Sequence, residues 1–253
     1  MRTHRTFTIA LLLAPTLALG ACGGSSDASE TPAPEPLTTT TADQLEPAVV
    51  EPVDGIVAGT DTDLAVYGAI GDTTPAQMLP ARTEFGSRRV LRVVGRYGTD
   101  DGWLEVLLPV RPNGSRGFVR AADVTLESTN LTVDIDLATK VLRVSDGDNG
   151  VLVETPIAIG SAENPTPTGD FYLTDILITG DEDSAYGPYA LGLSAHSETL
   201  SEFGGGDGQI GIHGTNQPSS IGRAVSHGCV RVSNDIVTAL ANTVPLGTPV
   251  VIH

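Results

Sequence analysis

The sequence is poor in positive charge. It contains 14 lysine and arginine residues against 31 aspartate and glutamate residues, a formal net charge of -17. Nucleic acids and anionic lipid surfaces are bound through basic patches, so the composition argues against both as partners. The chain also lacks a run of about 20 apolar residues that could span a bilayer. Its two cysteines are too few for a disulfide scaffold.

The length and composition of the chain are typical of a folded protein. The chain has 253 residues, of which 40% are hydrophobic and 18% are charged. This length is enough for one large domain or two small ones, and the apolar content is enough for a buried core. We therefore expect most of the chain to be globular.

The N-terminus has the pattern of an export signal. Two arginines precede a short apolar stretch over residues 7–19, too short for a spanning helix. The stretch runs into a Leu-Gly-Ala-Cys motif that ends at Cys22 and resembles the lipobox of bacterial lipoproteins. We predict a signal peptide over residues 1–21, lipidation of Cys22 and a lipid-anchored location on the outer face of the cell membrane. An ordinary secretory signal with an incidental cysteine is the alternative.

Residues 22–60 are rich in serine, threonine, proline and acidic side chains. Such a composition cannot bury enough apolar surface to offset the conformational entropy of the chain. We predict a disordered tether that lets the folded part reach into the cell-wall layer above the membrane.

Two β-rich units follow. Residues 61–127 contain short apolar runs broken by Gly, Asn and Pro turns, which indicate a small barrel or sandwich. The stretch Gly102 to Val106, with Gly117 to Arg120 after it, resembles bacterial SH3-like domains. This unit either binds the cell wall or serves as a spacer. Residues 128–253 are also strand-dominated, with one short helix that begins after Ser233 or Asn234 and ends at Pro245. We predict a mostly-β fold, a sandwich preceded by a small SH3-like barrel.

The residues that can carry chemistry lie in two short stretches of the second unit. One contains His213 and Gly214, and the other runs from Ser226 through Cys229 to Arg231. A thiol is mostly protonated at neutral pH, because its ordinary pKa is about 8.5, so attack on a carbonyl requires a neighbouring base. His213 and His227 are both candidates, and spacing alone does not decide between them.

The neighbouring glycines have a physical use as well. Gly228 permits close approach of a substrate carbonyl, and backbone amides near Cys229 can stabilise an oxyanion. Gly214 lets its own carbonyl reach the ring of His213 and fix the tautomer, the orienting role that a carboxylate has in a catalytic triad.

Together these stretches resemble the catalytic signature of the L,D-transpeptidase, or YkuD-like, family over roughly residues 129–253. The resemblance implies a mostly-β catalytic domain and cysteine acyl transfer on peptidoglycan stem peptides. It assigns Cys229 as nucleophile, His213 as acid/base and Gly214 as orienting carbonyl. It selects His213 over His227, which would shape the oxyanion region. Four residues match the rest of the motif: Ser226, His227, Gly228 and Arg231.

The resemblance also implies the reaction. Cys229 attacks the carbonyl of the third residue of a tetrapeptide stem and expels the terminal D-alanine. The amine of a second stem then resolves the thioester into a 3→3 cross-link, whereas water would give an L,D-carboxypeptidase. Carbapenems, which acylate this family, are expected to modify the same sulfur. No cofactor or metal is expected.

Arginine is scarce around this motif. After Arg143 the basic residues are Arg223 and Arg231, and both flank the nucleophile. Because arginine binds carboxylates in a bidentate fashion, we predict that both contact substrate, with a structural ion pair as the alternative for Arg231. Tyr186 and Tyr189 either line a cleft or pack, and Tyr189 is our candidate substrate contact. His196 is expected in a solvated loop or on the substrate side.

Three alternatives to cysteine catalysis remain open. Cys229 can be an inert core residue, as a lone cysteine in a strand often is. His213, His227 and Cys229 can supply three ligands to zinc, although no Cys-x-x-Cys or His-Glu-x-x-His pattern accompanies them. A non-catalytic lipoprotein that binds the wall through its SH3-like unit is the third.

Overall fold

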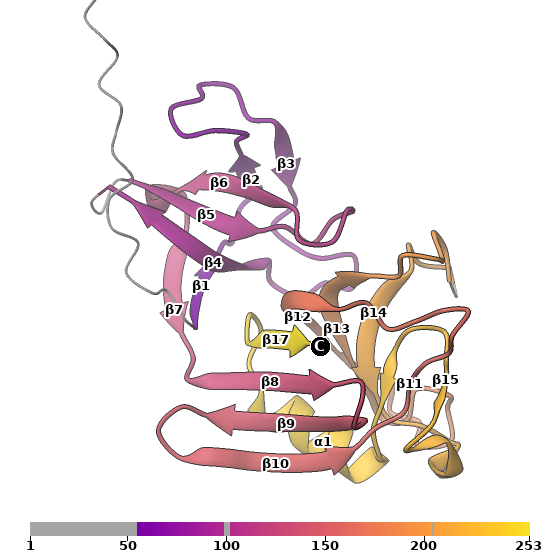
Figure 1. Ribbon diagram of the computed structural model, residues 1–253. Helices are drawn as coiled ribbons and strands as arrows, with labels where there is room; N and C mark the ends of the chain where they lie inside the picture. The colour runs from indigo at the N-terminus through magenta and orange to yellow at the C-terminus, as the bar shows by residue number, and fades with distance from the viewer. Residues whose placement is uncertain (1–54, 99–101, 204) are drawn as a thin grey trace, which may run out of the picture. The chain divides into compact units, whose positions relative to one another are not determined.

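The computed structural model describes residues 55–98, 102–203 and 205–253, all of which belong to one compact unit. The predictions for the signal peptide, for Cys22 and for most of the tether lie outside these ranges. The fold is mostly β, and α1 (Asn234–Thr243) is the single α-helix of the described residues (Figure 1). This confirms the predicted mostly-β fold with one short helix, while the SH3-like character of the first unit stays a prediction. Over the same ranges, no helix is long and apolar enough to cross a membrane.

The first half of the described chain forms a small β unit. Five of its strands make an antiparallel sheet in the order β6-β5-β4-β1-β7, while β2 and β3 pair separately. The strands are β1 (Ile56–Gly59), β2 (Leu64–Val66), β3 (Gln77–Leu79), β4 (Val90–Tyr97), β5 (Trp103–Leu107), β6 (Arg116–Arg120) and β7 (Thr125–Ser128). A single 3-10 turn, η1 (Ala121–Asp123), precedes β7.

Strand β1 lies inside the stretch that composition assigns to the tether. Its residues pair with both β4 and β7, and Val57 and Ala58 are buried. The predicted tether boundary at residue 60 is therefore wrong for residues 56–59. A composition averaged over the acidic, threonine-rich segment before it hides this short apolar run.

The second half is built on an eight-stranded sheet in the order β10-β9-β8-β17-β12-β13-β14-β16. The pairs β17–β8 and β14–β16 are parallel, and the other pairs are antiparallel. Its strands are β8 (Leu131–Asp136), β9 (Val141–Asp146), β10 (Gly150–Pro156), β12 (Gly169–Ile178), β13 (Tyr189–His196), β14 (Gln209–His213), β16 (Val230–Arg231) and β17 (Pro249–Ile252). The strands β11 (Ile159–Gly160) and β15 (Ala224–Ser226) form a separate parallel pair, and η2 (Pro218–Ser220) lies between β14 and β15.

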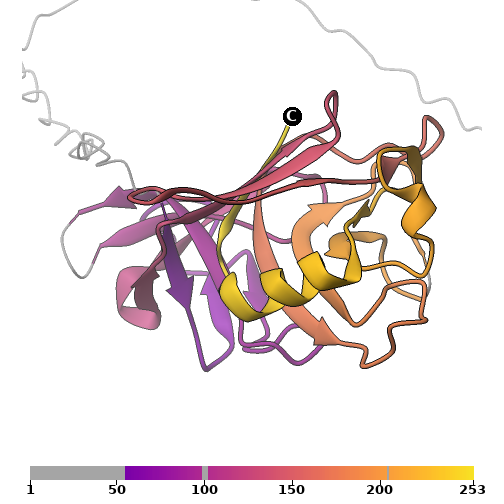
Figure 2. The same cartoon turned by 90° about the horizontal axis from the view of Figure 1, so that it is seen from below.

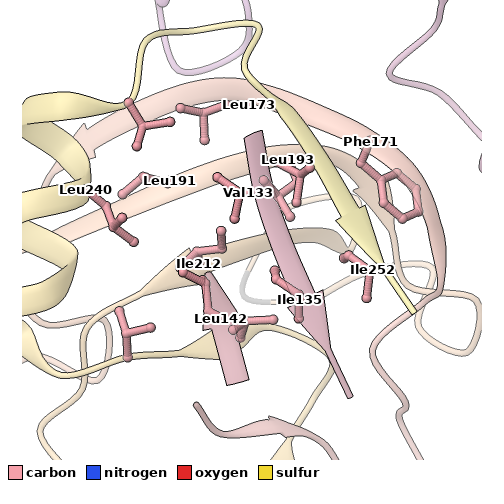
Figure 3. Close-up of a cluster of buried hydrophobic side chains, with 14 of the residues drawn as sticks. Val133, Ile135, Leu142, Phe171, Leu173, Leu191, Leu193, Ile212, Leu240 and Ile252 are labelled. Carbon is pink, nitrogen blue, oxygen red and sulfur yellow. The ribbon is translucent and has the colours of Figure 1, made fainter. Parts of the chain in front are cut away.

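The core of this half collects the apolar residues of alternating strand positions. Val133 and Ile135 of β8 point inward with Leu142 of β9, as the period-two pattern predicts (Figure 3). Helix α1 covers β13 and β14 and contributes Val237 and Leu240 to the same core (Figure 2). The predicted helix is thus confirmed.

Strand β12 serves two cores at once. Phe171 packs in the core of the second half, whereas its neighbour Tyr172 packs in the core of the first. Successive side chains of a strand point to opposite faces, so one strand can contribute to both. The hydroxyl of Tyr172 donates a hydrogen bond to the carbonyl of Leu107 on β5 at 3.3 Å. The two halves are therefore joined by the packing of β12 into both cores as well as by the continuous chain.

Candidate active site

The parallel pairing of β14 and β16 places His213 and Cys229 on one face. Ile212 lies opposite Val230 and His213 lies opposite Arg231. Cys229 directly precedes β16 and is two residues from Arg231, so the strand alternation puts the thiol on the same face as His213. Both residues also line the same two cavities. The strand pairing thus brings His213 to Cys229, a choice of histidine that the spacing in the sequence does not decide.

His213 is buried and has a defined tautomer. Its Nδ1 donates a hydrogen bond to the carbonyl of Gly214 at 2.6 Å, which leaves Nε2 as a proton acceptor. Burial lowers the pKa of His213 to about 4, with a further lowering by Arg231 and an opposing contribution from the Gly214 bond. The imidazole is therefore a neutral base at neutral pH.

Cys229 is a free, partly buried thiol. Burial raises its pKa, while a hydrogen bond from the Gly211 backbone and the charge of Arg231 act in the lowering direction. Among the described residues the sulfur makes no hydrogen bond to His213. Catalytic hydrogen bonds are often loose before substrate binds, so the shared cavity wall is the relevant geometry.

The loop before β16 is held by Ser226. Its hydroxyl donates to the carbonyl of Cys229 at 2.6 Å and accepts from the amide of Gly228 at 3.1 Å. Gly228 has φ +122°, and a Cβ there would lie 2.8 Å from Cδ1 of Ile210. Only glycine fits this backbone without strain. These bonds fix the direction in which the Cys229 side chain leaves the loop.

Thr166 supports this loop from a distance in sequence. Its buried hydroxyl donates to the carbonyl of Gly228 at 2.7 Å and accepts from the amide of Gly160 at 2.9 Å. The sequence alone predicted no role for Thr166. Pro165 and Pro167 on either side of it indicate a turn, but nothing in the local sequence identifies a partner 62 residues away.

Two cavities meet at the thiol and the imidazole. The acid-side cavity has a volume of about 480 Å³, and its acidic lining residues are Glu84 and Asp207. The arginine-side cavity has a volume of about 270 Å³ and carries Arg231. Cys229 and His213 line both, so the candidate nucleophile can be approached from two surroundings of opposite charge.

Arg231 makes no ion pair with any residue that the structure describes, and its buried Nε has no hydrogen-bond partner there. The alternative of a structural ion pair therefore finds no partner in these ranges. Arg223 is exposed and lies outside the lining of both cavities at Cys229. Its proposed contact with substrate stays a prediction.

The two tyrosines differ in position. The ring of Tyr186 lies 4.8 Å from that of His213 between centroids, tilted by 56°, and lines both cavities. Burial, with a contribution from Cys229, raises its pKa. Tyr189 packs against the core, and its carbonyl accepts a hydrogen bond from the Gly214 amide at 3.3 Å. The substrate contact of Tyr189 stays a prediction, whereas Tyr186 lines the cavities, which is one of the two positions expected for it.

The remaining histidines do not join the pair. His227 is exposed and stacks on Phe203, with ring centroids 4.9 Å apart. His196 is buried and its Nε2 pairs with Asp207 at 2.9 Å, so the expectation of a solvated loop is wrong. Across the described ranges, no group of three or more His, Cys, Asp or Glu residues is arranged to hold a metal ion. The zinc alternative therefore finds no ligand set there.

Comparison with known proteins adds to this geometry. Residues 130–252 match the family model described as the L,D-transpeptidase catalytic domain, YkuD. YkuD of Bacillus subtilis strain 168 is 39% identical over 121 residues, which cover 48% of this chain and 65% of that protein. YkuD of Bacillus licheniformis is 39% identical over 154 residues, which cover 58% of this chain and 84% of that protein.

The chain thus spans about two thirds of the length of the B. subtilis relative. Among solved structures, an L,D-transpeptidase from Mycobacterium tuberculosis H37Rv aligns with 81% of this chain and 92% of its own, at 16% identity and a TM-score of 0.41. The identity and coverage of the B. licheniformis relative, together with the family match, are sufficient for assignment. The chain belongs to the L,D-transpeptidase (YkuD) family.

Proposed function

We propose that this chain forms 3→3 cross-links in peptidoglycan through a thioester on Cys229. The observation that carries the proposal is the position of Cys229 and His213 at the junction of two cavities. A transpeptidase must bring two different peptides to one sulfur. A donor on one side and an acceptor on the other fits this arrangement better than hydrolysis, which needs a single substrate and water.

In the first half-reaction the proton of Cys229 moves to Nε2 of His213 as the sulfur attacks the carbonyl of the third stem residue. The resulting oxyanion collapses, the C–N bond to the terminal D-alanine breaks, and the imidazolium returns the proton to the departing amine. The neutral resting state of His213 suits the first transfer, because its lowered pKa leaves the ring free to accept a proton.

In the second half-reaction an acceptor amine attacks the thioester and gives a proton to His213. The C–S bond breaks, and the imidazolium reprotonates the departing sulfur. The Gly214 carbonyl holds the ring in one tautomer through both steps. The amide of Gly228 already donates to Ser226, so we assign the oxyanion to the amide of Cys229 instead.

Arg231 is the proposed anchor for the donor. It lines the arginine-side cavity without an ion-pair partner in the described part of the chain, next to the thiol. Stem peptides end in a carboxylate, and a guanidinium binds such a group through two parallel hydrogen bonds. This places the departing D-alanine on the arginine side. Arg223 and Tyr189 remain further proposed substrate contacts.

The proposal includes the cell location. A signal peptide over residues 1–21 and lipidation of Cys22 would anchor the enzyme to the outer face of the membrane. From there it would act on stem peptides in the wall and thereby affect cell shape. Carbapenems are proposed to acylate Cys229.

The test is intact-mass analysis after exposure to a tetrapeptide stem and, separately, to a carbapenem. We expect an adduct on the unsubstituted chain, none on Cys229→Ala and slow formation on His213→Ala. A second stem peptide should then yield a cross-linked dimer. Hydrolysed donor without dimer would favour the L,D-carboxypeptidase. No adduct with either reagent would overturn the enzyme assignment and favour the wall-binding alternative.

A further inference from the structure

The first half of the chain contributes to the acid-side cavity. Its turn over residues 83–87 is closed by hydrogen bonds from Thr83 N to Ser87 O and from Gly86 N to Thr83 O, each 3.0 Å long. Glu84 and Phe85 at the tip of this turn line the cavity that holds Cys229. The hydroxyl of Thr83 donates to the carboxylate of Asp175 on β12, which fixes the turn against the second half.

The acidic lining continues beyond this cavity. An adjoining cavity of about 240 Å³ shares four lining residues with the acid-side cavity: Glu84, Phe85, Asp207 and Gln209. Its own wall adds Asp175, of which only 1% is exposed, and the buried His196. We call Glu84, Asp207 and His196 the acid wall.

The acid wall presents hydrogen-bond acceptors. The Nε2 of His196 pairs with Asp207 at 2.9 Å, and its buried Nδ1 has no partner among the described residues. The basic side chain of the adjoining cavity, Arg89, directs its donors to the carbonyls of Pro80 and Arg82, both at 3.1 Å. The two carboxylates therefore suit a ligand that has several hydrogen-bond donors and a positive charge.

We propose that the acid wall binds the acceptor peptide through its ammonium group, with Glu84 and Asp207 as the carboxylate ligands. This inference rests on the proposed transpeptidase function and gives the first half of the chain a part in substrate selection. It also assigns direction: the carboxylate end of the donor lies beside Arg231, and the amine arrives from the opposite cavity. The captured ammonium releases one proton to solvent before the free amine attacks the thioester.

The experiment uses the full chain with a thioester preformed from a tetrapeptide donor. Aminolysis by a peptide that carries a free side-chain amine is measured against its concentration for Glu84→Gln, for Asp207→Asn and for the double variant. We expect the half-saturating acceptor concentration to rise about three-fold in each single variant and about ten-fold in the double variant, with the effect shrinking at high salt. The matched control is Glu202→Gln, because Glu202 is exposed and lies outside the three cavities.

Two further readouts separate recognition from general damage. The rate of thioester formation and the reaction with hydroxylamine, a neutral nucleophile, should be unchanged in every variant. A thioester whose aminolysis is insensitive to both substitutions would overturn this inference alone. Failure of the unsubstituted chain to form any thioester would overturn the proposed function and the inference with it.

Discussion

Arg231 lies directly opposite His213 in the parallel pair of β14 and β16, two residues beyond Cys229. A fixed cation therefore lies beside both groups that exchange the proton. Its charge lowers the pKa of the thiol and of the imidazole alike. Both effects favour an ionised sulfur beside a neutral imidazole. Burial of the thiol opposes the ionisation of the sulfur.

Removal of this cation should make the thiol less reactive. In Arg231→Gln the pKa of Cys229 rises further, so its alkylation by iodoacetamide at pH 8 should slow several-fold relative to the unsubstituted chain. Arg223→Gln is the matched control, since Arg223 is exposed and outside both cavities at the thiol. Equal alkylation rates in the two variants would contradict a role of Arg231 in the ionisation of Cys229.

The lowered pKa of His213 predicts an acid-sensitive fold. The ring has a pKa of about 4 when folded and 6.5 as the ordinary value, so the unfolded chain binds more protons between these limits. The free energy of unfolding should therefore fall as the pH drops from about 6.5 to 4, by up to ~3 kcal/mol from this residue. Urea unfolding at pH 4.5 and 7 should show a smaller difference for His213→Gln. An identical difference in both proteins would refute the prediction.

Gly228→Ala should strain the nucleophile loop. The new methyl group meets Cδ1 of Ile210 at 2.8 Å on a backbone with φ +122°. We expect a loss of about 1–3 kcal/mol in unfolding free energy, together with slower acylation of Cys229. Gly222→Ala is the control for backbone strain, because Gly222 has φ +84° but open space around it. If both variants lose the same stability, the contact with Ile210 contributes nothing.

Thr166→Val should destabilise the loop that carries Cys229, although Thr166 does not line the cavities at the thiol. The substitution keeps the shape but leaves the Gly228 carbonyl and the Gly160 amide without their buried partner. We expect about 1–3 kcal/mol of lost stability and a reduced rate of acylation, measured by denaturation and by intact mass. The exposed Thr168 provides the control, and Thr168→Val should behave as the unsubstituted chain does.

Local patterns predicted much of this fold. The alternation from Leu131 to Asp136 and the helical spacing from Ile236 to Val244 lie where β8 and α1 are found. Both signals depend on residues a few positions apart, so no knowledge of topology is needed to read them. The one clear boundary error, at β1, concerns four residues whose partners lie more than 30 residues away.

The parts of the site that escaped prediction depend on distant contacts. His196 was expected in a solvated loop or on the substrate side, yet it is buried, and Asn113 hydrogen-bonds both its amide and its carbonyl across 83 residues of sequence. Tyr186 and Glu84 line the cavity at Cys229, and Thr166 hydrogen-bonds the Gly228 carbonyl, each from a different segment. The local sequence around these residues does not predict their positions, because the order of the strands in the sheets brings the three segments together.

The shared strand β12 has a thermodynamic consequence for the whole described chain. Phe171 packs in the core of the second half, and the adjacent Tyr172 packs in the core of the first. Unfolding of the first half would therefore expose Tyr172, and unfolding of β12 would remove Tyr172 from the core of the first half. Calorimetry should then record a single melting transition. A fragment that consists of the second half alone would expose the ring of Tyr172 to solvent. We expect such a fragment to aggregate rather than to fold as an independent domain.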